Sequence, residues 1–316
     1  MEAIYRCRMT VLQKLRTRSI RMAIGEFLAT LIFVLFSLGS TINWAIAEEQ
    51  VHPASQLLIS VCFGLSAAII VRCFCNISGA HINPAVTLSM AFAGKLGVPR
   101  AFVLICAQCL GATTGSAILF ALTPNAVRGN LGTTWLRPGL TVFQGFVVEL
   151  LITFQMIFIV FATCDPNSYN LQSSAAMSIG ISVTIGHLFA IPYTGASMNP
   201  ARSLGPAIVT GEWNNHWMYW LGPILGGIIA ASLYKHFLDP DLETPASEGE
   251  RAPKMLLEEV EPVMTFNMEM KDLTEDPESC NIVVDIEMCD HNRLDAFDII
   301  EEKLANDSVI QQQEEE

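Results

Sequence analysis

The stretch Ser78-Gly-Ala-His-Ile-Asn-Pro-Ala-Val-Thr-Leu88 decides the fold, because its Asn83-Pro84-Ala85 returns 116 residues later as Asn199-Pro200-Ala201-Arg202. Asn is a strong helix N-cap and Pro is tolerated at the first helical position, so each copy predicts the start of a helix. If each Asn oxygen caps its helix, the NH₂ group is left with two donors and no acceptor. Such a group can bind the oxygen of a water or a carbonyl.

The apolar runs that follow the two triplets are short, at about residues 83–93 and 199–210. At about 1.5 Å per residue, each predicted helix is about 16 to 18 Å long. A membrane hydrocarbon core is about 30 Å thick, so neither helix spans it alone. Two such helices placed end to end would span it.

The composition is that of an integral membrane protein, with 51% hydrophobic residues and a mean hydropathy of +0.41 over 316 residues. The net charge of −13 divides unevenly along the chain. Residues 1–238 carry 13 Lys and Arg against 7 Asp and Glu (net +6), whereas residues 239–316 carry 5 against 24 (net −19). The basic residues lie at predicted membrane edges and not on one face with interleaved aromatics, so no nucleic acid partner is expected.

Six apolar runs have the length of transmembrane helices, at about residues 22–44, 55–74, 99–122, 143–163, 174–191 and 217–238. The short helices fall after the second and the fifth. The same order therefore occurs twice, in repeats at about 22–122 and 143–238, and each repeat begins with a helix that carries an acid, Glu26 or Glu149. Three full helices per repeat require the second repeat to enter from the opposite side of the membrane. We predict an all-α membrane protein with six transmembrane helices, two re-entrant half helices and an inverted repeat.

Lys and Arg counts predict the orientation of this domain, residues 22–238. Six basic residues lie in the N-terminal segment 1–21, and none lies in the loop at 43–54. Both termini are therefore expected in the cytoplasm, and we expect the plasma membrane to be the location. The acidic segment 239–316, which contains five prolines, is predicted to be a disordered cytoplasmic tail that could recruit a partner.

Nine cysteines are predicted to be reduced, because most lie in or beside apolar spans, where a free thiol packs as a small hydrophobic group. Cys106 and Cys109 have redox-motif spacing, but they fall inside a predicted membrane helix. The spacings Gly111-x-x-x-Gly115 and Gly222-x-x-x-Gly226 predict close helix crossings. No nucleophile–base pair or metal-ligand cluster appears, so we expect neither an enzyme nor a cofactor or metal.

The two Asn-Pro-Ala triplets, with Arg202 after the second, on six spans and two half helices, resemble the aquaporin family of water channels over about residues 20–238. The resemblance implies a pore with Asn83 and Asn199 at its midplane and the positive ends of both half helices directed at it. It also implies a homotetramer with water as permeant and lipid around it. Protons and ions would be excluded, as in aquaporin-type pores.

The same resemblance implies a role for each remaining candidate residue. Phe63, His187, Ala196 and Arg202 match the selectivity filter of water-selective members, where the polar groups would provide donors for the water oxygen. Ala196 occupies a position where some relatives carry a mercury-reactive Cys. Loop carbonyls of Gly79, Ala80, His81, Gly195, Ala196 and Ser197 would accept hydrogen bonds from water. Glu26 and Glu149 would support those loops.

Two alternatives to a strict water channel stay open. The first is a broader channel that passes glycerol, urea, ammonia or peroxide. Ser203 argues against it, because glycerol-conducting relatives usually carry an acid directly after the Arg. His187 also argues against it, because a small residue at that position would widen the filter. The second is a junction or signalling protein that keeps the fold while its acidic tail recruits partners.

Taken alone, without the family resemblance, Phe63 would be interpreted as a packing residue and His187 as a hydrogen-bonded buried imidazole. An arginine at membrane depth, in contrast, generally faces a partner or a water-filled cavity.

Overall fold

A computed structural model describes residues 2–44, 55–164 and 174–238, in which every regular element is a helix and no strand occurs. Residues 16–239 form one compact unit, which contains the whole helical bundle. Six helices in the described residues are long and apolar enough to cross a membrane. In chain order the elements are α1 Glu2–Gly39, α2 Gln56–Ser78, α3 Pro84–Phe92, α4 Val98–Leu122, α5 Asn125–Arg128, α6 Val142–Thr163, α7 Ala175–Thr194, α8 Pro200–Thr210, α9 Met218–Leu233 and a π-helical turn, Tyr234–Leu238.

The two short helices begin as the sequence predicts. Asn83 caps α3 and Asn199 caps α8, each with extended backbone, and a proline follows at the first helical position. With 9 and 11 residues, the helices are about 14 and 17 Å long. Neither is long enough to cross a bilayer, and both therefore are half helices.

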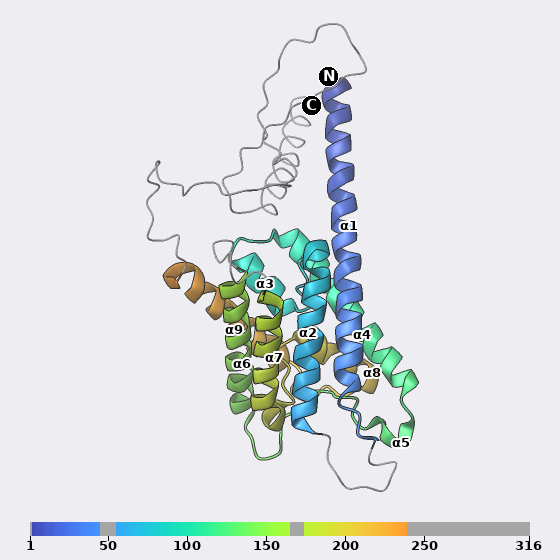
Figure 1. The fold of residues 1–316 in the computed structure, drawn as a ribbon, viewed down its shortest axis with the longest axis vertical. Coiled ribbons are helices and arrows are strands. Elements are labelled where there is room, and N and C mark those ends of the chain that lie inside the picture. Colours follow the sequence, from blue (N-terminus) through green and yellow to red (C-terminus); the bar gives the residue numbers. More distant parts are fainter. Residues whose placement is uncertain (1, 45–54, 165–173, 239–316) are drawn as a thin grey trace, which may run out of the picture. The chain divides into compact units, whose positions relative to one another are not determined.

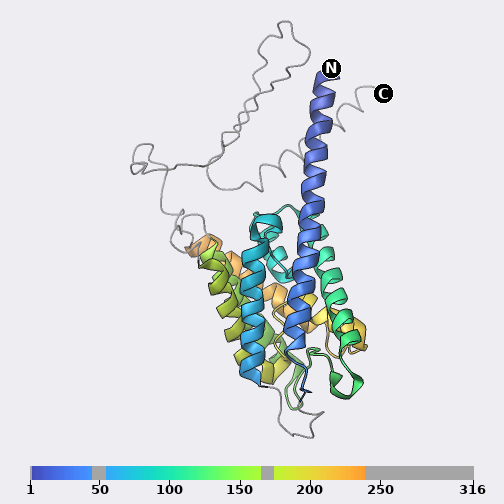
Figure 2. The ribbon, with the colours of Figure 1, turned by 45° about the vertical axis from the view of Figure 1, so that its right-hand side comes forward.

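Both half helices pack against the same two longer helices. Helix α3 contacts α4 and α9, and α8 contacts the same two helices. Among the long helices, α2 packs along α7, as Figures 1 and 2 show from two directions. Helix α6 packs along α9. The expected glycine crossings are present: a methyl group added to Gly115 would lie 2.6 Å from the Leu31 carbonyl oxygen, and one added to Gly222 would lie 2.9 Å from the Glu149 Cβ.

Some helix ends differ from the predicted ones. Helix α1 ends at Gly39, not residue 44, and it extends back through the basic N-terminal segment to Glu2. Helix α2 continues to Ser78 and α7 to Thr194, each to the residue before a left-handed glycine. Hydropathy could not place these ends, because the last turns carry polar residues that bind partners inside the protein. The predicted tail, residues 239–316, lies outside the described residues.

The described cysteine side chains are free thiols, at Cys62, Cys73, Cys75, Cys106, Cys109 and Cys164. Cys106 and Cys109 lie on the same helix, α4, and they form no disulfide. Cys7, Cys280 and Cys289 lie outside the residues whose side chains are described.

Candidate functional site

Each half helix is preceded by a loop that a buried glutamate holds in place. Glu26 accepts hydrogen bonds from the backbone N–H groups of His81 (2.9 Å) and Ile82 (2.7 Å). Glu149 accepts the equivalent bonds from Ser197 (2.9 Å) and Met198 (3.0 Å). Both carboxylates are fully buried. The two acids therefore serve as acceptors for amide groups that would otherwise be unsatisfied inside a membrane.

A hydroxyl group completes each of these loop anchors. Ser78 Oγ donates to Glu26 at 2.7 Å and accepts from the Ala80 N–H at 3.2 Å. Thr194 Oγ1 donates to Glu149 at 2.5 Å and accepts from the Ala196 N–H at 3.2 Å. The two repeats thus use the same local geometry with different residues.

The anchored loops have unusual backbone angles. Ala80 and Ile82 have φ of 48°, and Ala196 and Met198 have φ of 54° and 52°. For residues with a Cβ, each such angle costs about 1–2 kcal/mol. The bonds to the two glutamates offset this cost.

The left-handed residues leave loop carbonyls without hydrogen-bond donors. Among the described residues, none donates a hydrogen bond to the carbonyl of any of the six predicted acceptors, Gly79, Ala80, His81, Gly195, Ala196 and Ser197. Unpaired carbonyls at membrane depth are stable where they line a water-filled space.

Asn83 and Asn199, the predicted midplane residues, are bonded across the two repeats. Asn83 Oδ1 caps α3, and its Nδ2 donates to the Met198 carbonyl at 2.9 Å. Asn199 Nδ2 donates to the Ile82 carbonyl at 2.8 Å. The NH₂ group of each was expected to bind the oxygen of a water or a carbonyl, and a loop carbonyl accepts from one of its two N–H bonds. One N–H bond per asparagine is left to bind another oxygen.

Three of the predicted filter residues lie together. The rings of Phe63 and His187 are 4.1 Å apart between centroids, and the guanidinium carbon of Arg202 is 4.9 Å from the Phe63 ring centre. Phe63 comes from α2, His187 from α7 and Arg202 from α8, and all three are almost completely buried. Ala196, the fourth predicted member, is also fully buried.

The polar atoms of this cluster include one acceptor and one donor without a protein partner. His187 Nδ1 lies 2.9 Å from the Val183 carbonyl, so in a neutral imidazole Nδ1 carries the proton and Nε2 is an acceptor. Nε2 of His187 and Nε of Arg202 are buried, and neither has a partner among the described residues. Besides the donors for a water oxygen that the family resemblance implies, this geometry supplies an acceptor. A small molecule that both donates and accepts, such as water, suits this pair.

Sequence reasoning missed the residues that hold Arg202 in position. Arg202 Nη1 donates to the Gly132 carbonyl at 2.6 Å, from the loop between α5 and α6. In the same region Thr134 Oγ1 donates to Ser203 Oγ at 3.0 Å, and Ser203 Oγ lies 2.6 Å from Ser197 Oγ. Gly132 predicts an irregular loop, but no local pattern connects it to an arginine 70 residues away.

A second missed residue supports the first loop. Gln108 of α4 donates from Nε2 to Glu26 at 2.8 Å and to Thr87 Oγ1 at 2.9 Å. Nδ1 of His81 lies 3.1 Å from the same Thr87 hydroxyl. A glutamine within an apolar span could have indicated this role, because a polar group at membrane depth needs hydrogen-bond partners inside the protein.

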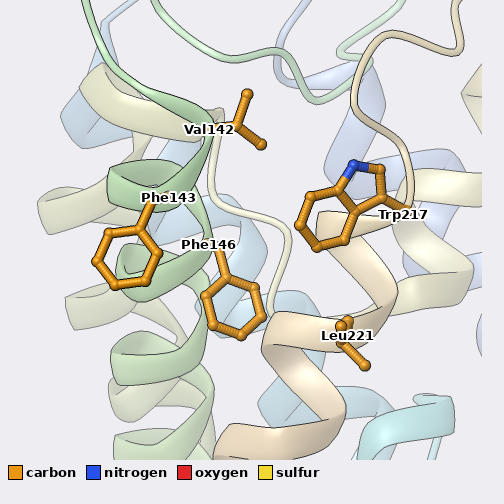
Figure 3. A pocket seen from close by; sticks show the side chains of 5 residues that line it. All are labelled: Val142, Phe143, Phe146, Trp217 and Leu221. Carbon is orange, nitrogen blue, oxygen red and sulfur yellow. The ribbon is translucent and has the colours of Figure 1, made fainter.

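An apolar hollow of about 420 Å³ lies elsewhere, between the starts of α6 and α9 (Figure 3). It is lined by Val142, Phe143, Phe146, Trp217 and Leu221. None of the predicted filter or midplane residues lines it. The hollow is therefore not the candidate channel.

Comparisons with known proteins agree with this geometry. The sequence pattern of the major intrinsic protein family matches residues 13–234. Aquaporin-4 of Homo sapiens is 55% identical over 219 residues, which cover 69% of this chain and 68% of that protein, and aquaporin-4 of Bos taurus gives the same values. The lens fiber major intrinsic protein of Homo sapiens is 44% identical over 232 residues, 73% of this chain and 86% of that one. The X-ray structure of the aquaglyceroporin from Plasmodium falciparum has the same fold, with a TM-score of 0.64 and 22% identity over 71% of this chain and 99% of that one.

Proposed function

Since this chain belongs to the major intrinsic protein family, which includes the aquaporins, we propose that it is a passive water channel that conducts water in single file down osmotic gradients. The chain is a channel and not an enzyme. The observation that carries the proposal is the cluster of Phe63, His187 and Arg202, which is closely packed and buried and has one acceptor and one donor without protein partners.

Phe63, His187, Ala196 and Arg202 form the selectivity filter in this proposal. The rings of Phe63 and His187, with centroids 4.1 Å apart, pack against each other and together form a bulky wall of the filter. A water molecule can donate to His187 Nε2 and accept from Arg202 Nε. We expect a filter walled by these two rings and a fixed guanidinium group to admit water and to exclude glycerol.

Asn83 and Asn199 bind water at the midplane through the N–H bond that each retains. The carbonyls of the six loop residues accept hydrogen bonds from water on either side of that point. Both half helices direct their N-termini, with their positive partial charge, at the two asparagines. A water whose oxygen accepts from both amides cannot pass a proton along the file, and cations are repelled, as in aquaporin-type pores. Glu26 and Glu149 support the loops through their hydrogen bonds.

Ser203 is a further argument for water over glycerol. Its hydroxyl is bonded to Thr134 and Ser197, so this position holds the outer loop against α8. An acid here, as in glycerol-conducting relatives, would place a charge among these hydroxyls. A broader channel remains the competing proposal, and it predicts glycerol permeability comparable to that of water.

Stopped-flow light scattering on proteoliposomes tests the proposal. The full chain should raise osmotic water permeability well above that of empty liposomes, and glycerol permeability should stay near the empty-liposome value. Equal water permeability in loaded and empty liposomes would refute a channel function. High permeability to both solutes would instead support the broader channel.

The channel is proposed to be a homotetramer of the plasma membrane with both termini in the cytoplasm and the acidic tail available to a cytoplasmic partner. Family membership supports the assembly, and the Lys and Arg distribution supports the orientation. Cross-linking in native membranes tests the tetramer, and protease access to the two ends in sealed cells tests the orientation. Deletion of residues 245–316 with measurement of permeability and surface abundance separates a channel from a scaffold role of the tail.

A further inference from the structure

Three consecutive residues in the connection between α4 and α6 bond to half helix α8. Gly132 accepts the hydrogen bond from Arg202, which belongs to the proposed filter. Thr133 Oγ1 lies 3.4 Å from the hydroxyl of Thr210, the last residue of α8. Thr134 forms the bond to α8 that is described above. The position of this connection therefore determines where the carbonyl group that holds Arg202 lies.

The connection makes a turn, residues 128–132, that ends at this carbonyl group. Gly129, Leu131 and Gly132 have φ of 55°, 54° and 68°. Left-handed angles are unfavourable for a residue with a Cβ, so the turn depends on contacts that keep its shape. The Leu131 side chain is fully buried. The Leu131 N–H donates to the Arg128 carbonyl at 3.1 Å, so the shape of the turn depends on where Arg128 is held.

The Arg128 side chain is fixed to the end of α4 by three contacts. Its Nε and Nη2 donate to the carbonyl of Thr123, the C-cap of α4, at 3.1 and 2.8 Å. Its guanidinium carbon lies 3.7 Å from the centre of the Phe120 ring. A guanidinium group presents several donors in one plane and stacks on aromatic rings, which fixes its orientation as well as its position. Arg128 thus attaches the start of the turn to α4.

Arg128 and Arg202 therefore hold the two ends of the same turn. The side chain of Arg128 fixes its first residue, and Arg202 bonds to its last carbonyl group. The direction of that carbonyl is set within the turn, because the N–H of the same peptide group, that of Thr133, donates to the Asn130 carbonyl at 3.0 Å. Release of Arg128 would displace this peptide group and move the acceptor away from Arg202.

We propose that Arg128 is a positioning residue for the filter, which fixes the turn so that the Gly132 carbonyl holds Arg202 in place. The proposal rests on the proposed water-channel function and deepens it. Arg128 is not itself a member of the filter. It acts through Arg202, so conduction depends on a second arginine that is bonded to the end of a different helix.

Arg128→Met tests the proposal in proteoliposomes that contain the full chain. Methionine keeps an apolar side chain next to Phe120 but has no donor for the Thr123 carbonyl. Water permeability per channel should fall by about two- to tenfold, a range typical of coupling between residues that share a hydrogen-bond network. The physical reason is that a guanidinium group without its fixed acceptor can occupy the path of the water. Arg137→Met is the matched control, because it removes the same charge from an exposed position in the same connection, and it should retain wild-type permeability.

A double-mutant cycle with Arg202→Met separates positioning from a purely structural role. If Arg128 acts through Arg202, Arg128→Met should have no further effect on water permeability in the Arg202→Met background. A structural role predicts the same fold decrease in both backgrounds. That result would overturn the proposal, as would unchanged or higher permeability of Arg128→Met in the wild-type background.

Gly115→Ala replaces the cycle if Arg202→Met does not fold. A methyl group at Gly115 would lie 2.6 Å from the Leu31 carbonyl oxygen, so the variant destabilises the contact of α1 with α4 and not the turn. Lower water permeability per folded channel in Arg128→Met than in Gly115→Ala supports the proposal, and equal permeability of the two overturns it. If wild-type liposomes conduct no water, the proposed function itself fails. If the wild type conducts water and Arg128→Met conducts it equally well, only this inference fails.

Discussion

Replacement of Asn199 by alanine should destabilise the protein by an amount that can be worked out from its hydrogen bonds. Asn199 Oδ1 caps α8 by accepting from the N–H groups of Ala201 (3.0 Å) and Arg202 (3.3 Å). Loss of such a cap costs about 1 to 2 kcal/mol. Asn199 Nδ2 also donates to the Ile82 carbonyl, which would be left unpaired at a cost of about 1 to 3 kcal/mol. The expected loss is about 2 to 5 kcal/mol.

Asn199→Asp separates the two contributions. The carboxylate keeps an oxygen that can cap α8, but it cannot donate to the Ile82 carbonyl and places a negative charge next to it. We therefore expect the cap to be retained and the loss to come from the unpaired carbonyl and the added charge. Asn214→Ala, at an exposed position in the loop before α9, is the control and should change stability by less than about 0.5 kcal/mol.

The assay is unfolding in mixed detergent micelles, with the unfolding free energy compared among the three variants and the wild type. Osmotic water permeability of the same preparations reports whether the midplane still conducts. If Asn199→Ala unfolds within about 0.5 kcal/mol of wild type, the bond across the repeats contributes no net stability. The argument that it joins the two loops would then be refuted.

Three further predictions follow from the same geometry. Gly132→Ala, at φ of 68°, should cost at least about 1 to 2 kcal/mol of stability and lower water permeability by releasing Arg202; circular dichroism melts and stopped-flow measurements check both effects. Burial lowers the pKa of His216, in the loop before α9, below its usual 6.5. Between the lowered pKa and 6.5 the unfolded chain binds more protons than the folded protein, so the free energy of unfolding should fall as pH drops below about 6.5. His216→Gln keeps an acceptor for the Trp220 indole N–H and should reduce this dependence of the unfolding free energy on pH. An unchanged pH dependence would contradict the assignment to His216. Mercuric chloride should not reduce the water permeability of the wild type and should reduce that of Ala196→Cys. Equal inhibition of both proteins would mean that the reactive thiol is not at position 196.

Local patterns were sufficient for most of the fold. Hydropathy and length predict the six long helices, and the Asn-Pro-Ala triplets predict α3 and α8 because an N-cap and an N1 proline act within a few residues of each other. Glu26 and Glu149 could be singled out because an acid within an apolar span needs partners. Helix ends were less predictable, since they depend on tertiary contacts such as the bond from Ser78 to Glu26.

Contacts between distant parts of the chain could not be predicted in the same way. The bond from Asn83 to Met198 joins residues 115 positions apart, and the bond from Arg202 to Gly132 joins residues 70 apart. No periodicity or spacing records such pairs.

The central claim is that Phe63, His187 and Arg202 decide what passes through the pore, and His187→Ala tests it most directly. Removal of the imidazole takes away the ring 4.1 Å from Phe63 and the acceptor at Nε2. Stopped-flow measurements on matched proteoliposomes should find water permeability well above glycerol permeability in the wild type, and a large rise in glycerol permeability in His187→Ala. Glycerol permeability that already equals that of water in the wild type, and that the substitution leaves unchanged, would contradict the account.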